Sequence, residues 1–274
     1  MPVIGELETV PRFVLERHQI AQVICQVRFS PVLRLQQQTE VVPFQEEIRD
    51  RYPGFSAERA VGFLITPQGV VQQDTGAQNY RFIDQEHGVM LVLGTDFVAI
   101  ETRSYVEIED IVTRMTEAVE LTARLYQPPQ RSRVGLRFTN EFRFESTDLS
   151  SRVRAAFTPA ILGPAGTDEL ASATEGTQSV LRLRSSAGNL LQVLHGLNPQ
   201  GGTTVPPIAA WPVPSIPQEP FYLLDLDAYS EDQVRFDSEP VAEQVWSFND
   251  QIRTLFAWAT TDEFRRDILG QRAR

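Results

Sequence analysis

Two aspartates, Asp225 and Asp227, are the residues of this sequence whose type and spacing could support chemistry. They lie in the segment FYLLDLDAY (221–229), which is typical of a β-strand, so both carboxylates project from one face of that strand. Two carboxylates about 7 Å apart could hold a divalent cation together with water, or could receive arginine side chains. The same face begins with Phe221 and Leu223, and we therefore favour a salt bridge or an exposed strand end over a ligand site.

Arginines recur on the faces of several predicted strands, at Arg28, Arg133, Arg137, Arg143, Arg182 and Arg184. If these strands share a sheet, the side opposite the core could present guanidinium groups to an anionic ligand or to an acidic partner protein. Pairing with the abundant acidic residues of the chain itself is the plainer alternative, and we favour it.

An amide stands at an apolar position of the segment VGLRFTNEF (134–142). The alternation of this segment places Asn140 on the same face as Val134, Leu136, Phe138 and Phe142. A buried amide without partners would cost about 1–3 kcal/mol of desolvation, so we expect Asn140 to hydrogen-bond across the sheet or to a neighbouring loop, fixing the register where the two halves of the chain meet. A β-bulge that turns the amide outward is the competing account.

The sequence contains none of the strong catalytic or cofactor motifs. It lacks a phosphate-binding glycine loop ending in lysine, a G-x-S-x-G elbow, an H-E-x-x-H pair and a C-x-x-C pair. The three histidines, His18, His87 and His195, are scattered, and the single cysteine, Cys25, alternates with apolar residues as a buried, unreactive thiol would. We assign no catalytic residue, no metal ligand and no cofactor, and expect that the protein is not an enzyme.

Composition narrows the class of protein. With 274 residues, 42% of them hydrophobic and 22% charged, the chain is typical of a globular protein, and its formal charge of −11 disfavours binding to nucleic acid. No secretory signal and no membrane-spanning run is recognisable, so we expect a cytoplasmic protein. All 25 basic residues are arginine; codon bias explains the missing lysines more simply than selection against acylation does.

The hydrophobic pattern predicts two successive sets of elements in the same order. In the first set we expect a strand, a short helix, three strands and a long helix, at 21–29, 39–52, 79–84, 89–94, 97–103 and 104–126. In the second set we expect a strand, a partly helical stretch, three strands and a long helix, at 132–144, 149–173, 179–184, 189–196, 221–229 and 238–259.

The repeated order predicts an α+β fold made of two tandem β-α-β-β-β-α units, at 1–127 and 128–274, with antiparallel sheets. The units could join in one continuous domain, as a pseudo-two-fold saddle like that of TATA-binding folds, or could close around a cavity as in helix-grip folds. A proline-rich insertion at 196–220 interrupts the second unit, and Trp211 at its middle could dock on a partner.

Several short motifs resemble those of a sporadically distributed, largely uncharacterised prokaryotic family of roughly 250-residue proteins. They are ICQVRFSPV, VGLRFTNEF, LLDLDAY and FAWATTDEF. The resemblance implies that Arg137, Asn140, Asp225 and Asp227 occupy positions typical of the family. It also implies a setting in mobile genomic islands, where accessory and phage-defence genes gather, and it implies no reaction.

Taken together, the sequence favours a non-catalytic binding or adaptor protein that engages another protein through the open sheet face or the insertion. The alternative is a binder of small anions, or an enzyme, that uses the arginines and the Asp225/Asp227 pair. Nucleic-acid binding on the saddle is the third hypothesis. We expect a protein partner and no membrane association, and a homo-oligomer is compatible with this composition.

Overall fold

A computed structural model describes residues 4–66, 69–144, 148–205 and 217–273, with the backbone alone described at 59–66 and 69–77. Trp211 lies outside the described residues, as do residues 206–216 of the proline-rich insertion. The strands are β1 (Phe13–Leu15), β2 (Ile20–Phe29), β3 (Gly54–Thr66), β4 (Gly69–Asp84), β5 (Val89–Leu93), β6 (Phe97–Thr102), β7 (Gln130–Arg143), β8 (Ser179–Arg184), β9 (Leu190–Asn198), β10 (Phe221–Ser230), β11 (Val234–Arg235) and β12 (Gln271–Ala273). The helical elements are η1 (Leu33–Gln36), η2 (Gln38–Val41), α1 (Val42–Ile48), α2 (Ile108–Tyr126), α3 (Leu149–Ala156), α4 (Pro159–Leu162), η3 (Gly163–Gly166), η4 (Ala171–Ala173), α5 (Glu239–Ala259) and the π-helical turn η5 (Phe264–Ile268).

Ten of these strands form one large sheet. Its hydrogen-bonded order is β3-β4-β5-β6-β2-β7-β10-β9-β8, with β11 paired to β7, while β1 pairs with β12 in a separate small sheet. The neighbours β3/β4, β4/β5, β5/β6, β8/β9 and β9/β10 all run antiparallel. The expected mixture of helices with a large antiparallel sheet is therefore confirmed.

The chain divides into two compact units, each assembled from separated segments. Unit 1 contains Met1–Val23, Leu136–Ser230 and Trp246–Arg274, and unit 2 contains Ile24–Gly135 and Glu231–Val245. Because β2, β7 and α5 each contribute residues to both units, this division does not follow the expected boundary between residues 127 and 128.

Unit 2 is built around strands β4, β5 and β6 and the helices α1 and α2. Every residue of β5, VMLVL, is buried, and the apolar stripe of α2 packs against β6. The ring of Phe44 on α1 contacts both Phe82 on β4 and Tyr126 at the end of α2, with centroid distances of 5.5 and 6.1 Å. These contacts form the aromatic end of the core of unit 2.

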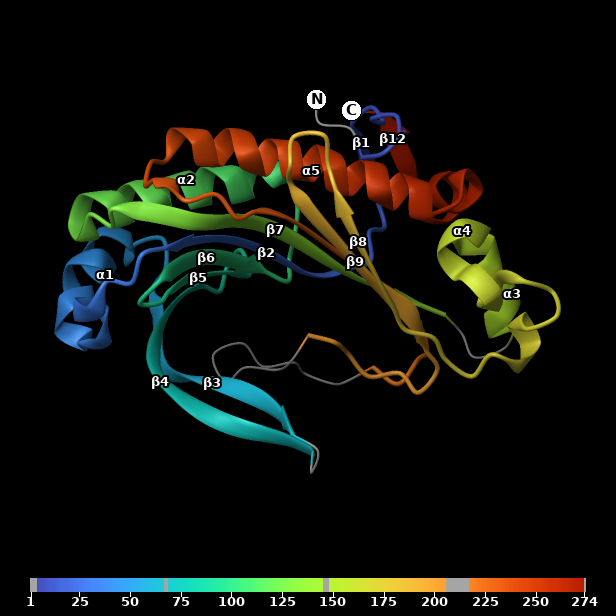
Figure 1. Cartoon of the computed structure of the whole chain (residues 1–274), viewed down its shortest axis with the longest axis horizontal. Helices are drawn as coiled ribbons and strands as arrows, with labels where there is room; N and C mark the ends of the chain where they lie inside the picture. The colour runs from blue at the N-terminus through green and yellow to red at the C-terminus, as the bar shows by residue number, and fades with distance from the viewer. Residues whose placement is uncertain (1–3, 67–68, 145–147, 206–216, 274) are drawn as a thin grey trace. The chain divides into compact units, whose positions relative to one another are not determined.

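The first half of the chain holds four strands between α1 and α2, and the expected three must be corrected. The additional strand is β3, which pairs with β4 in a long hairpin (Figure 1). Its sequence, GFSAERAVGFLIT, mixes glycine and charged residues into the apolar ones, so it lacks the alternation on which the other strands were recognised. In the second half the expected strands at 179–184, 189–196 and 221–229 correspond to β8, β9 and β10.

Unit 1 combines β8, β9, β10 and the second part of β7 with the helices α3 and α4 and the second part of α5. Its core is aromatic. The ring of Phe157 lies 4.1 Å from that of Tyr222 and 5.2 Å from that of Phe142, centroid to centroid, and Phe264 lies within 6.2 Å of both Phe142 and Phe157. The face of β10 that carries Tyr222 is thereby covered, and the opposite face carries the aspartates.

Candidate binding surface and a buried charge network

The strongest contact on the aspartate face of unit 1 joins Arg137 of β7 to Asp225 of β10. Nε of Arg137 donates to Oδ1 of Asp225 at 2.8 Å, and Nη2 pairs with Oδ2. The hydrogen bond that Arg137 donates to Asp225 raises the pKa of Arg137; burial opposes this, and the charges of Asp225 and Asp227 reinforce it. Only 5% of the Asp225 side chain is exposed. The expected salt bridge is present, so the Asp225 carboxylate is committed to an internal pair.

The pairing register of the strands places further candidate residues on the face of the sheet that carries Asp225. Asp227 lies opposite Gln192 on β9, and Gln192 lies opposite Arg182 on β8. Since residues paired across antiparallel strands share a face, and alternate residues along a strand do so too, Arg184 belongs to it as well. We call this surface the polar face, made up of Arg137, Arg182, Arg184, Gln192, Asp225 and Asp227.

Arg182 and Arg184 differ from most other arginines of the chain because neither has an acidic partner among the described residues. Nε of Arg182 donates to Oε1 of Gln192 at 3.3 Å, and Nη1 of Arg184 donates to the carbonyl oxygen of Gly188 at 3.0 Å. Both partners are uncharged, so both positive charges remain available. Internal pairing, which we expected to account for the arginines, does not account for these two.

The remaining expected arginines are engaged within the protein. Arg28, in unit 2, pairs with Asp96 at 3.1 Å. Arg143, on β7, pairs with Glu141, donates to the carbonyl oxygen of Gly202 at 2.9 Å and lies 5.1 Å from the ring centroid of Phe221. For Arg28 and Arg143 the plainer alternative is correct, and Arg133 also takes part in an interaction within the protein.

Asn140 is buried and hydrogen-bonded, as we expected of an amide at an apolar position of a strand. Its side chain is buried, and Nδ2 donates to the carbonyl oxygen of Leu224 at 2.9 Å. The expected hydrogen bond across the sheet is confirmed, and the β-bulge account, which needed an outward amide, is wrong. The bond joins β7 to β10, two strands of the second half, and does not mark the meeting of the two halves.

The neighbouring residue Glu141 anchors the start of the proline-rich insertion. Oε1 of this buried carboxylate accepts hydrogen bonds from Oγ1 of Thr203 at 2.9 Å, from the backbone N–H of Thr204 at 2.6 Å and from Oγ1 of Thr204 at 2.9 Å. Sequence reasoning missed this role. An acid beside Asn140 and Phe142 in the middle of a long predicted strand was the available signal.

A pocket of about 480 Å³ opens in unit 1 at the end of β9, lined in part by Phe221, Leu223 and His195. Nδ1 of His195 shares a 2.9 Å hydrogen bond with the hydroxyl of Tyr222, and burial lowers the pKa of the imidazole. A side chain at Gly196 would place Cβ 1.9 Å from the carbonyl oxygen of Thr177, so the close approach of the two backbones there requires glycine.

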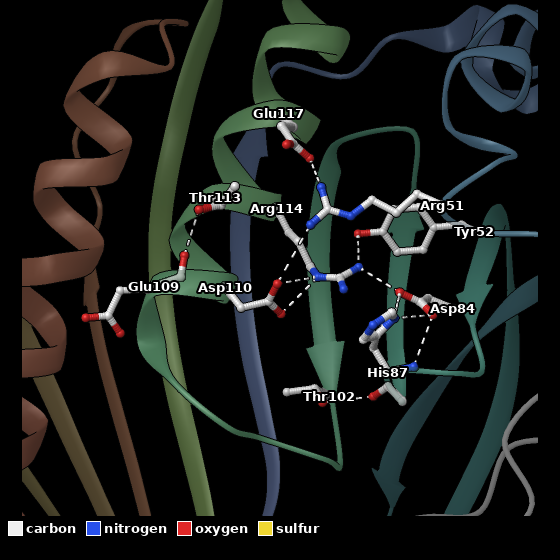
Figure 2. A network of polar contacts seen from close by, with 11 residues as sticks. Arg51, Tyr52, Asp84, His87, Thr102, Glu109, Asp110, Thr113, Arg114 and Glu117 are labelled. Carbon is white, nitrogen blue, oxygen red and sulfur yellow. Dashed lines mark hydrogen bonds and ion pairs between the residues drawn. The ribbon is translucent and has the colours of Figure 1, made fainter. Parts of the chain in front are cut away.

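Unit 2 contains a polar network that the sequence did not reveal, centred on Arg114 of α2 (Figure 2). Its guanidinium donates through Nε to both carboxylate oxygens of Asp110 at 2.9 Å and through Nη1 to the hydroxyl of Tyr52 at 3.1 Å. Nη1 also lies 3.1 Å from Oδ2 of Asp84. Only 4% of the Arg114 side chain is exposed. Burial opposes the charge, but these bonds outweigh it and raise the pKa of Arg114.

Asp84 connects this network to an exposed histidine. Its carboxylate accepts the backbone N–H of His87 at 3.1 Å and contacts Nδ1 of His87 at 2.9 Å (Figure 2). Burial acts to raise the pKa of Asp84, but the hydrogen bonds from His87 and Arg114 prevail, so the pKa is lowered. The spacing of Asp110 and Arg114, one helical turn apart beside the apolar stripe, was the only sequence signal.

A pocket of about 300 Å³ lies beside this network, between α1 and α2. Its charged lining is largely paired: Arg51 contacts Glu117, and Arg124 lies 3.0 Å from Glu47. We therefore regard this part of unit 2 as stabilising structure.

Cys25 is fully buried, and burial raises its pKa to about 12, as expected of an unreactive thiol. Within the described ranges, no three histidine, cysteine, aspartate or glutamate side chains are grouped so that they could hold a metal ion. No helix in the described part of the chain is long and apolar enough to span a membrane.

Comparison with known proteins adds no relative: the chain matches no protein-family model and no curated protein sequence.

Proposed function

We propose that the chain is a non-catalytic protein-binding module whose partner docks on the polar face, at its β8 side. The observation that carries the proposal is the pair of exposed guanidinium groups, Arg182 and Arg184, for which the described residues supply no carboxylate in a chain of net charge −11. Most of the other arginines whose side chains the structure describes have an acidic partner within the protein. Two arginines that have none among the described residues, side by side on one strand, suit an acidic surface of another molecule.

A protein fits this surface better than nucleic acid does. The excess of 11 negative charges repels a phosphate backbone over the length of an oligonucleotide, whereas two arginines suffice for a local acidic segment. Arg137, the other cation of the face, is held by Asp225 and is not available for a phosphate.

A small anionic ligand held by the guanidinium groups of Arg182 and Arg184 is the second candidate, although neither arginine lines the pocket of about 480 Å³ in the same unit. It predicts a rise in melting temperature with anionic metabolites that disappears on Arg182→Gln and Arg184→Gln. If every melting temperature stays unchanged in the presence of such metabolites, this candidate fails.

We propose in addition that the two halves of the chain arose by duplication of one unit. Within the sheet, the strands that follow β2 on one side are β6, β5, β4 and β3, and the strands that follow β7 on the other side are β10, β9 and β8. In both halves the order of these strands across the sheet is therefore the reverse of their order along the sequence. This shared order supports a duplication, and with it a saddle whose surface serves recognition. An adaptor in the cytoplasm, encoded within a mobile or phage-defence cassette, is the biological role that the family resemblance suggests.

Photo-crosslinking in the native cell tests the function. A photoreactive amino acid replaces Val180, an exposed residue of β8, in one variant and Arg49, an exposed arginine at the end of α1, in the control. We expect one discrete adduct with another protein from position 180, absent from position 49 and lost when Arg182→Glu/Arg184→Glu is added. The absence of an adduct, or the same adducts from both positions, contradicts the proposal.

A further inference from the structure

Strand β8 is the last strand of the sheet on its side. It pairs with β9 along its whole length, from Ser179 opposite His195 to Arg184 opposite Leu190. No other strand within the described residues pairs with it. Five of its six side chains are exposed and the sixth is half-buried. The outer edge of β8 therefore presents backbone N–H and C=O groups to solvent.

The edge carries few of the features by which proteins prevent further strand pairing. Such edges are usually blocked by proline, by charged side chains, by shortness, by a bulge or by a covering element, and of these β8 has its two arginines and its length of six residues. The sequence SVLRLR contains no proline, its register with β9 is continuous, and Val180 and Leu181 are 55% and 38% exposed. An extended segment could add to β8 and satisfy both its backbone groups and its apolar side chains.

Charge decides what kind of segment fits. Arg182 and Arg184 lie two residues apart on one face, so a strand beside β8 with carboxylates at the same spacing would pair with both. A second copy of the chain fits poorly, because antiparallel pairing of two β8 strands would gather four guanidinium groups on neighbouring strands. The occupant that the charges favour is an acidic peptide.

We propose that β8 accepts an extended acidic segment of the partner protein by strand addition, with two carboxylates in alternate positions on Arg182 and Arg184. This inference rests on the proposed protein-binding function and specifies the chemistry of its partner. The backbone edge supplies the docking geometry, and the two arginines select an acidic sequence with a period of two residues.

The test uses the full chain and a fluorescein-labelled hexapeptide that contains Glu-Val-Glu between threonine and isoleucine residues. Fluorescence anisotropy measures binding of this probe and of a matched peptide with glutamine in place of glutamate. Two further forms of the acidic peptide are N-methylated on alternate residues, in the two opposite registers. Only one register directs its N–H groups toward β8, so strand addition predicts that one methylated form binds and the other does not.

We expect the acidic probe to bind, the glutamine peptide to bind far more weakly, and Arg182→Glu/Arg184→Glu to weaken binding about tenfold or more. The tenfold value follows because each exposed ion pair strengthens binding by roughly up to fivefold, and reversal of the charge adds repulsion. Arg49→Glu is the matched control and leaves binding unchanged. Both sets of substitutions lie at exposed positions, and circular dichroism checks that the variants fold.

The possible failures are distinguishable. Equal binding of both N-methylated forms overturns strand addition but leaves recognition of an acidic protein standing. No dependence on Arg182 and Arg184, together with no crosslink at position 180, overturns the proposed function as well. If sedimentation shows a dimer, and that dimer must dissociate before the probe binds, then a second copy of the chain occupies the edge. That result overturns the acidic peptide as the occupant of β8.

Discussion

Replacing Arg114 by methionine is expected to be among the most damaging single changes in unit 2. Methionine keeps most of the length of the side chain but removes the guanidinium that serves Asp84, Asp110 and Tyr52. Only 6% of the Asp84 side chain is exposed, so Arg114→Met leaves a buried carboxylate whose remaining side-chain partner in this network is His87. Asp110 is 38% exposed and can turn to water, so it adds little.

The magnitude follows from burial. Breaking a buried ion pair from one side costs about 3–5 kcal/mol, because the other charge stays desolvated. The lost hydrogen bond to Tyr52 falls within that figure, at about 1 kcal/mol. We therefore expect Arg114→Met to lower the free energy of unfolding by about 3–5 kcal/mol, measured by urea denaturation followed by circular dichroism.

Arg124→Met is the matched control. Arg124 belongs to the same helix, and its Nη1 lies 3.0 Å from a carboxylate oxygen of Glu47, but its side chain is 58% exposed. We expect no measurable change in stability, since water replaces the partner of an exposed ion pair. Equal losses for the two variants, or a loss below about 1 kcal/mol for Arg114→Met, would refute the reasoning that burial makes this network important.

Three further outcomes follow from the structure. Because the pKa of Asp84 is lowered on folding, its contribution to stability is present above the unfolded pKa and is lost as pH falls through the folded value. The difference in stability between the wild type and Asp84→Asn should therefore be constant at neutral pH and shrink below about pH 4. The buried thiol of Cys25 should react with a thiol reagent only after denaturation, and prompt reaction of the native protein would contradict its burial. Asn140→Ala should lower the free energy of unfolding by about 1–3 kcal/mol, since it leaves the carbonyl of Leu224 without the amide; a neutral result in urea denaturation would count against the cross-strand bond.

Periodicity predicted the fold wherever apolar residues alternate or recur regularly. The continuous apolar run of β5 and the spaced stripe of α2 were recognisable because burial selects apolar side chains at fixed intervals. Strand β3 was missed since glycine and charged residues interrupt its pattern. The interleaved units could not be predicted, because pairing between distant strands leaves no mark in local periodicity.

Part of the candidate surface was accessible from spacing alone. The alternation of Asp225 and Asp227, and of Arg182 and Arg184, predicted correctly that each pair shares a face. Spacing could not show that Arg137 pairs with Asp225 while Arg182 does not, because that depends on which strands are neighbours. The Arg114 network was missed for the same reason, since Tyr52 and Asp84 are distant from it in sequence.

Amide hydrogen exchange tests the central claim most directly, with the chain bound to the protein that crosslinks at position 180. Recognition at β8 predicts that exchange slows at the amides of residues 179–184, whereas exchange in β5, buried in unit 2, stays unchanged. Unchanged exchange throughout β8, with slowing confined to another segment, would contradict the assignment of this strand as the binding edge.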